Sequence, residues 1–399
     1  MNVIKKITFI TLSLVNMQST FSRTVASSQT FMFVHPVFQH IALDKALWHT
    51  ALFDKEKRTA VQVTGFHQKA FQTDHVSTFF LPAERSRVRV NATEFTRDVR
   101  PQWLGLPETF DGYVTLAPSY HSCGFRVEAR HMIGDLLPIP FLKNFWLSAS
   151  VPFVVSKQNL NIGQESVSNA AATTNTVYDI ITAFKNPDWN YSKIDTREAK
   201  KTIPEIRFGY GSTIFSRGQG YAVTYSSLSI PLHKPQPNEY LFDNQIGHNG
   251  HIGLMWGLSM QLPINNEIDS YQVNLHADLE NTFLFNAHEY RTFDLYGKEW
   301  SRYVLFREKD QPLNVTIPGV NVLTQKVSVD PHNTVDLAAG IRVNAKSLEF
   351  DFGYGLWAHG GEKIKLIDTW HEVYGIAGSV ANTSASASTI STLAADDAT

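Results

Sequence analysis

The histidines of the tetrapeptide His248-Asn249-Gly250-His251 come nearest to a reactive motif in this chain. Two imidazoles three positions apart could hold a metal ion, and a histidine near an Asn-Gly pair would suit a lipid hydrolase if a serine accompanied it. That serine is missing, and side chains three positions apart on a strand point to opposite faces. A loop before Ile252 explains the tetrapeptide better, so we predict no catalytic residue, no metal ligand and no cofactor.

A larger set of candidate residues consists of charged side chains on the polar face of alternating segments. Charges of this kind on the wall of a pore tune its selectivity through the local potential. In a filled interior, the same side chains would instead pair with one another. The sequence leaves both arrangements open, and it predicts that the following residues line the interior: Arg126, Glu128, Arg130, Glu205, Arg207, Asp278, Glu280, Arg342, Glu349 and Asp351.

The elements that must position these charges are strands, because apolar residues recur at every second position. The clearest case is the stretch 334–356, in which two alternating arms flank a short break at 345–347. Side chains alternate across a strand with a period of two, so this stretch predicts a hairpin of two long, two-faced strands. Its apolar face carries Val335, Leu337, Ala339, Ile341 and Val343, then Leu348, Phe350, Phe352, Tyr354 and Leu356.

The length of each arm favours a membrane strand over a strand of a secreted sandwich, although alternation alone fits both. Each arm runs for about nine to eleven residues, the length that a tilted strand needs to cross the hydrocarbon core. Strands of soluble domains average about five to six residues. The polar face mixes small residues with single acids and an arginine. We therefore expect the apolar face to contact lipid and the polar face to line a lumen.

Further segments alternate in the same way, and together they predict about ten or eleven strands. No repeat of solenoid or propeller period accompanies them, so an all-β antiparallel barrel accounts for them best. The additional segments are Ala60–Gln68, Gly112–Ser119, Gly124–Met132, Phe145–Val154, Glu205–Tyr210, Gly220–Ile230, His251–Leu262, Tyr271–Glu280 and Trp300–Phe306.

A long insertion, residues 156–204, interrupts the strands and carries one helical signal. A helix of about ten residues is not stable by itself in water, so its apolar stripe must dock on something. We expect it to dock on the barrel, either inside the lumen or across one mouth. The stripe recurs at i, i+3, i+4 and i+7, before Asn186-Pro187, and consists of Val177, Ile180, Ile181 and Phe184.

The composition excludes several classes of protein. The chain has 399 residues, of which 43% are hydrophobic, 12% aromatic and only 18% charged, whereas ordinary domains carry about 25% charged residues. Its net charge is −2 and no basic stripe occurs, so no nucleic-acid partner is expected. A single cysteine, Cys123, excludes an internal disulfide framework and any CxxC site.

The two ends of the sequence lie outside the predicted barrel domain, residues 29–376. Residues 1–28 have the order of a secretory signal peptide, with two lysines, an apolar run and then small residues, which predicts export. Residues 377–399 are small and polar and predict a low-complexity loop or tail. Because an open sheet edge cannot face lipid, either the amino-terminal segment closes the barrel as a strand or the closing strand is missing from this chain.

Several stretches resemble a group of uncharacterised bacterial outer-membrane β-barrel proteins of porin-like pattern. They are TFMFVHPVFQHIALDKALWH, RDVRPQWLGLP, FWLSASVPFV, VYDIITAFKNPDWNYSKI and SLEFDFGYGLW with its HGGEKI extension, and they are spread along the chain from Thr30 to Ile364. The resemblance implies an outer-membrane location and a transmembrane antiparallel barrel of about 12 strands, within a range of about 10–14. That group has no assigned catalytic or ligand residues to carry over.

The residues and the resemblance together predict an outer-membrane barrel that is not an enzyme and forms a porin-like channel for passive passage of small solutes. Its expected partners are outer-membrane lipids and those solutes. Two alternatives stay open. One is a closed barrel that acts as a surface-binding or adhesion scaffold through its long loops. The other, least favoured, is an outer-membrane lipid hydrolase, which a Ser–His pair on the outer wall would support.

Overall fold

The structure is a computed structural model that describes residues 30–40, 58–71, 73–82, 85–93, 98–133, 144–168, 179–217, 220–265, 271–312, 315–331, 333–345 and 348–377. The predicted signal peptide, residues 1–28, lies outside the described residues, as does the predicted tail beyond residue 377. None of the described helices is long and apolar enough to cross a membrane.

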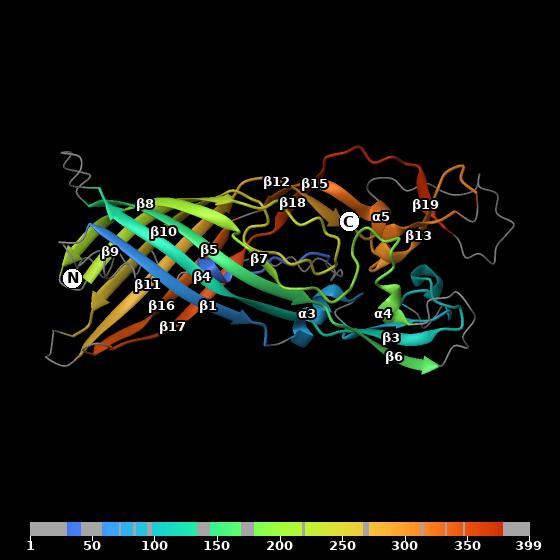
Figure 1. Cartoon of the computed structure of the whole chain (residues 1–399), viewed down its shortest axis with the longest axis horizontal. Helices are drawn as coiled ribbons and strands as arrows, with labels where there is room; N and C mark the ends of the chain where they lie inside the picture. The colour runs from blue at the N-terminus through green and yellow to red at the C-terminus, as the bar shows by residue number, and fades with distance from the viewer. Residues whose placement is uncertain are drawn as a thin grey trace.

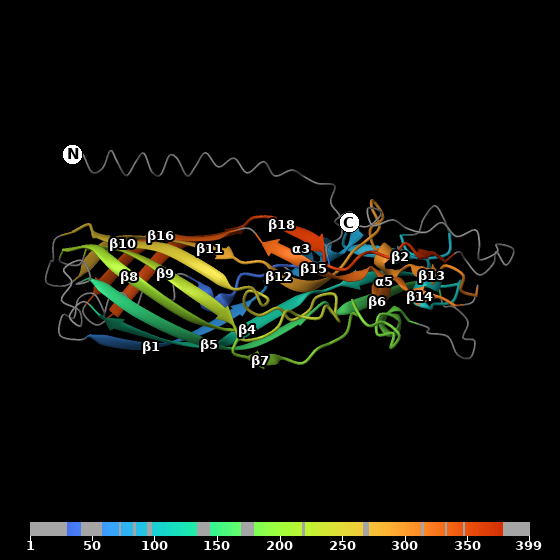
Figure 2. The same cartoon turned by 90° about the horizontal axis from the view of Figure 1, so that it is seen from above.

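One large antiparallel sheet dominates the molecule and curls into a half-barrel, as Figures 1 and 2 show. The predicted all-β fold is therefore confirmed. A short strand, β7 (Lys200–Thr202), pairs with β5 beside the main path. The nine strands of that path are, in spatial order, β1 (Thr59–Lys69), β4 (Ser119–Met132), β5 (Phe145–Asn159), β8 (Glu205–Arg217), β9 (Gly220–Pro231), β10 (Gly253–Pro263), β11 (Gln272–Leu284), β16 (Thr334–Ala345) and β17 (Leu348–His359).

The hairpin predicted over residues 334–356 is present as β16 and β17, each of 12 residues. Their antiparallel register places Leu337 opposite Leu356 and Arg342 opposite Asp351. Directly opposed residues lie on the same face of a sheet. The pairing therefore gathers the apolar residues of both arms on one face and the charged residues on the other, as the alternation predicts.

The two faces of the main sheet are reversed relative to those of a soluble domain. Ile341 and Phe352 are 43% and 69% exposed, whereas Arg342 is only 2% exposed. The same contrast runs around the half-barrel, because its concave face is polar and buried. Large apolar side chains that are exposed on the main strands include Phe125, Leu147, Phe208, Leu228, Leu254, Trp256, Leu275, Phe350 and Leu356.

The connections between the main strands are short at one end of the half-barrel and long at the other. The short ones are 133–144, 218–219, 264–271 and 346–347, and the long ones are 70–118, 160–204, 232–252 and 285–333. The long connections, together with residues 360–377, form what we call the cap, which extends the molecule along its longest axis (Figure 1). Residues 156–159 of the predicted insertion belong to β5.

Three small sheets and several short helices build the cap. The sheets have the strand orders β12-β15-β18, β14-β13-β19 and β2-β3-β6. The strands are β2 (Arg87–Val90), β3 (Asp111–Leu116), β6 (Ile162–Ser168), β12 (Ala287–Thr292), β13 (Leu305–Glu308), β14 (Ile317–Pro318), β15 (Thr324–Pro331), β18 (Glu362–Leu366) and β19 (Tyr374–Ile376). The helical elements are α3 (Thr73–Phe80), η4 (Pro101–Leu104), α4 (Ile180–Ala183), η6 (Ser301–Tyr303) and α5 (Gly319–Leu323).

The cap has a hydrophobic core to which all four long connections contribute. Phe80, Phe184, Leu241 and Trp300, one from each connection, are at most 1% exposed in this core. The indole Nε1 of Trp300 donates a hydrogen bond to the Phe80 carbonyl oxygen at 2.8 Å. Burial raises the pKa of the Tyr303 phenol, which lies in the same core. The four long connections thus pack together as one unit on a common core.

The structure corrects three predictions for segments that belong to this core. The strand predicted at 112–119 is β3, which pairs in a cap sheet and not in the main sheet. The helix predicted in the insertion is only α4. Ile180 and the C-cap residue Phe184, expected to dock on the barrel inside the lumen or across one mouth, pack in the cap core. Aromatic partners explain this, because the Phe184 ring lies 5.0 Å from the Tyr303 ring. Val177 lies outside the described residues. The strand predicted at 300–306 begins only at Leu305, as β13, because Trp300 and Tyr303, at the 3-10 helix η6, pack in the same core.

Replacing Asp179 should loosen this part of the cap. The Asp179 carboxylate accepts hydrogen bonds from the Thr182 backbone N–H at 2.7 Å and the Thr182 hydroxyl at 2.8 Å, and so caps α4. Loss of such a cap costs about 0.5–2 kcal/mol. We expect Asp179→Ala to hasten proteolysis of the cap, measured by limited digestion, while Asp188→Ala, which removes an exposed carboxylate nearby, leaves the rate unchanged. Equal rates for the two variants would contradict this role.

The main sheet ends at β1 and β17, which do not pair with each other within the described chain. Because every neighbouring pair on the path is antiparallel, β1 and β17 run in the same direction, toward the cap. Both faces of β17 are largely exposed. Residues 30–40 do not close the gap as a strand, since they form the 3-10 turn η1 (Val37–Gln39) and lie on the concave side. Closure by a strand within residues 30–40 is therefore excluded, and residues 1–29 and 41–57 lie outside the described residues.

Candidate functional site

The candidate site is the concave face of the half-barrel together with residues 30–40, which we call the N-terminal segment. Phe38 of this segment is 2% exposed and packs in a small apolar cluster with Phe66, Val154 and Ile246. These partners come from β1, β5 and the connection between β9 and β10. The segment therefore contacts the wall of the half-barrel at points far apart in the sequence.

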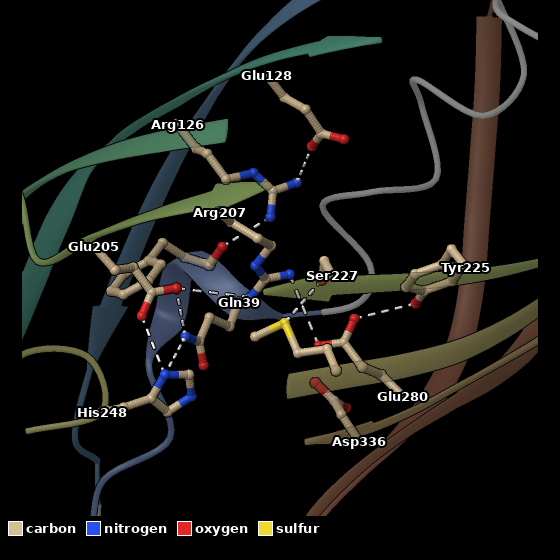
Figure 3. A network of polar contacts seen from close by, with 12 residues as sticks. Gln39, Arg126, Glu128, Glu205, Arg207, Tyr225, Ser227, His248, Glu280 and Asp336 are labelled. Carbon is tan, nitrogen blue, oxygen red and sulfur yellow. Dashed lines mark hydrogen bonds and ion pairs between the residues drawn. The ribbon is translucent and has the colours of Figure 1, made fainter. Parts of the chain in front are cut away.

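Polar contacts attach the same segment to the charged wall, and Figure 3 shows them at close range. The Arg126 guanidinium donates a hydrogen bond from Nη1 to the carbonyl oxygen of Phe38 at 2.9 Å. The Gln39 amide Nε2 donates to Glu205 Oε1 at 2.9 Å and lies 3.3 Å from His248 Nδ1. Because these groups are buried, each contact replaces hydration that the wall has lost.

Aromatic contacts hold the beginning of the segment against β17. The Phe33 and His35 rings stack on the Trp357 ring, with centroid distances of 5.8 and 5.0 Å. His35 Nε2 also lies 3.3 Å from Asp336 Oδ2, on the neighbouring strand β16. The N-terminal segment thus reaches from β17 across the concave side to β1 and β5, where Phe38 packs.

Arg126, Glu128 and Arg130 form the first of three charged groups on this face. The Glu128 carboxylate lies between the two guanidinium groups, 3.1 Å from Arg126 Nη2 and 2.8 Å from Arg130 Nη2. The three side chains alternate along β4 with Val127 and Ala129, so they share one face. Their side chains are at most 8% exposed, which makes this a buried triad and not a ring of hydrated charges.

Glu205, Arg207 and Glu280 form the second group, in which the contacts are longer. Arg207 lies 3.9 Å from Glu205 and 3.8 Å from Glu280. The Tyr225 hydroxyl donates to Glu280 at 3.1 Å, and His248 Nδ1 lies 3.1 Å from Glu205. Glu205 therefore contacts both the N-terminal segment and the loop that carries His248 (Figure 3).

Arg342, Glu349, Asp351 and Asp278 form the third group, near the short-turn end. Arg342 lies 3.1 Å from Glu349 and 3.0 Å from Asp351. Asp278 accepts a hydrogen bond from Ser259 on β10, and His276 lies 2.8 Å from Asp351. Glu349 and Asp351 are 43% and 33% exposed because they belong to the edge strand β17.

All ten charged residues singled out in the sequence thus lie on one face and fall into three groups, with four arginines facing six carboxylates. Most of them contact a residue of opposite charge, as expected for a filled interior in which the charged side chains pair with one another. Sequence reasoning missed His35, Gln39 and Trp357 and assigned His248 only to a loop, because their partners lie far away along the chain; Gln39 and Glu205 are 166 positions apart. No local spacing could have indicated such contacts.

The histidines of the tetrapeptide at 248–251 contact carboxylates and not a serine. His248 lies beside Glu205, and His251 Nε2 lies 2.7 Å from Glu289 Oε1. Among the described residues, no three histidine, cysteine, aspartate or glutamate side chains are grouped so that they could hold a metal ion. These two histidines therefore order buried carboxylates of the concave face and the cap.

No family model and no curated protein matches this sequence. The functional proposal therefore rests on the geometry of the half-barrel, the N-terminal segment and the cap.

Proposed function

We propose that this chain forms an outer-membrane β-barrel channel for passive passage of small solutes, with the N-terminal segment as an internal plug. The reversed faces of the main sheet carry this proposal. Exposed apolar side chains such as Trp256 and Phe352 would be costly in water, whereas lipid solvates them. Export by a signal peptide over residues 1–28 belongs to the same proposal.

The distribution of connections supports a membrane orientation. Outer-membrane barrels have short turns on the periplasmic side and longer loops outside the cell. At one end of the half-barrel only two residues of sequence separate β8 from β9 and β16 from β17, and the cap lies at the other end. In this proposal the cap faces the exterior and the exposed apolar band contacts outer-membrane lipids.

Strand direction limits how the proposed barrel closes. Because β1 and β17 run in the same direction, antiparallel closure needs an odd number of further strands. One such strand gives ten in all and three give twelve, both even numbers, as antiparallel barrels of this class require. A second copy in the same membrane orientation offers only strands parallel to β17 at this edge, so it would not complete an antiparallel wall.

The charges on the concave face support weak selectivity for cations in the proposed channel. Six carboxylates face four arginines there, and Glu349 and Asp351 are the most exposed of the ten. Local potential of this kind acts on passing ions and weakens as salt screens it. The proposed preference for cations should therefore be larger at low than at high ionic strength.

Replacing Leu258 by arginine tests the lipid-facing surface. Leu258 lies in the middle of β10, between Gly257 and Ser259, on the apolar face. An arginine near the midplane costs about 2–4 kcal/mol. We expect Leu258→Arg to lose that much in urea unfolding from lipid vesicles, while Leu258→Met stays close to wild type. Equal stability of the two variants in vesicles would argue against a lipid-facing β10.

The cap favours a second candidate function, a surface-binding scaffold. Loops that only flank a pore do not need a common core, yet here four connections share one. In that case the barrel anchors the cap, and no current should pass through the purified protein under any condition. The lipid-hydrolase alternative gains no support from the carboxylate partners of His248 and His251.

A further inference from the structure

A basic hollow lies on the outward face of the cap sheet β2-β3-β6. It has a volume of about 430 Å³, within the range of about 300–1,000 Å³ that small-molecule sites occupy. Six residues line it, of which three are arginines and only one is acidic: Arg85, Ser86, Arg87, Arg89, Asp98 and Tyr113. None of these residues belongs to the N-terminal segment or to the three charged groups described above.

The strand pattern of β2 fixes these arginines on a rigid support. Val88 and Val90 are fully buried in the cap core, so the alternating Arg87 and Arg89 must point outward. Tyr113 on β3 stands directly opposite Arg89. The Arg87 and Arg89 guanidinium carbons lie 4.3 and 5.3 Å from the centre of the Tyr113 ring, so the ring holds both cations close together.

The three arginines differ in how tightly acidic partners hold them. Arg89 binds Asp111 through two hydrogen bonds, of 2.9 and 3.2 Å, and also donates to the Tyr113 hydroxyl at 3.0 Å. Arg85 pairs with Asp98 at 2.6 Å but remains 54% exposed. Arg87 has only an exposed contact of 3.3 Å with Glu165, and pairs of this kind are weak. Arg87 is therefore the cation most available to an incoming anion.

We propose that this hollow binds a phosphate monoester carried on a group of about the size of a sugar. Each of the three arginines has one carboxylate beside it, but the Glu165 pair is exposed and weak, so a phosphate monoester with a charge of about −1.5 to −2 at neutral pH would compete with Glu165 for Arg87. The planar guanidinium forks of Arg85 and Arg87 suit the oxygens of such a group. The hollow is much larger than a phosphate ion, which leaves room for the attached group.

The phosphate monoester could be soluble or part of a lipid, and the two sources are distinguished by probe. Glucose 6-phosphate and short-chain dihexanoyl phosphatidic acid would each be titrated into the detergent-solubilised full chain by calorimetry. Binding of the first alone indicates a soluble sugar phosphate, and binding of the second alone indicates a lipid headgroup. Binding of neither overturns the proposal, as does equally tight binding of inorganic phosphate, which needs no large hollow.

Three variants assign the binding to the hollow. Arg87→Gln should weaken it at least about tenfold, because a charge-assisted contact is lost. Arg217→Gln removes an exposed arginine at the end of β8 far from the cap and should leave the affinity unchanged. Glu165→Gln removes the carboxylate that competes for Arg87, so it should tighten binding. Equal affinities for Arg87→Gln and Arg217→Gln would overturn the proposal. This test is independent of any channel activity.

Discussion

Releasing the N-terminal segment should raise the single-channel conductance of the purified protein severalfold. The triple variant His35→Ala, Phe38→Ala, Gln39→Ala removes the contacts that this segment makes with Trp357, with the apolar cluster around Phe66 and with Glu205. The residues around the predicted signal-peptide cleavage site stay unchanged, so export should be preserved. The segment then no longer fills the concave side, and the path along the charged wall widens.

A matched control separates release of the segment from a general effect of mutation. Val34→Ala changes the residue next to His35 and should leave the conductance at the wild-type value. Planar-bilayer recordings of all three proteins would be compared at low and high salt, since screening reduces the influence of the wall charges. A triple variant that inserts normally but passes no more current than wild type would show that the segment does not plug a pore. We would then favour the scaffold function of the cap.

Replacing Glu128 by alanine should destabilise the protein by about 3–5 kcal/mol. Glu128 lies between Arg126 and Arg130, and all three side chains are almost completely buried. Its removal leaves two guanidinium groups without the carboxylate that offsets their loss of hydration. The free energy of unfolding would be measured by urea titration in lipid vesicles, in which the midpoint should fall at unchanged slope.

Glu165→Gln provides the control for this experiment, because it breaks an ion pair of similar length at the surface. The pair of Glu165 and Arg87 is more than half exposed on both sides, so its loss should cost less than about 1 kcal/mol. If Glu128→Ala lowered the free energy of unfolding as little as Glu165→Gln, we would conclude that water reaches the triad of Arg126, Glu128 and Arg130. That result would favour an open, hydrated lumen over the paired interior, and it would change where we expect solutes to pass.

Local pattern predicted the main strands well because a period of two is a property of the chain itself. In β16 and β17 the alternation identified the strands, their pairing and the exposed face that carries Ile341 and Phe352. It also identified which charged residues share the other face. The other strands of the main sheet follow the same alternation, apart from an irregularity in β8 between Thr213 and Phe215, so few tertiary contacts were needed to infer it.

The same reasoning failed in the cap, where alternation and helical spacing were both present. The segment 300–306 was predicted as a strand but begins with the 3-10 helix η6, and Phe184 was predicted to dock on the barrel but packs on Tyr303. Aromatic residues from four separate connections pack together there in one core. A local window contains only one of the four partners, so the pattern could not indicate which surface each would cover.

What the sequence determined by itself is therefore the two-faced character of the strands: their approximate bounds, their apolar outer face and the set of charges opposite. The tertiary structure decided how those charges pair, that residues 30–40 lie along them, and that the loops condense into a cap with a basic hollow. The reason is the separation of the partners. Gln39 and Glu205, or Phe80 and Trp300, meet only after the sheet has curled and its long connections have come together at one end.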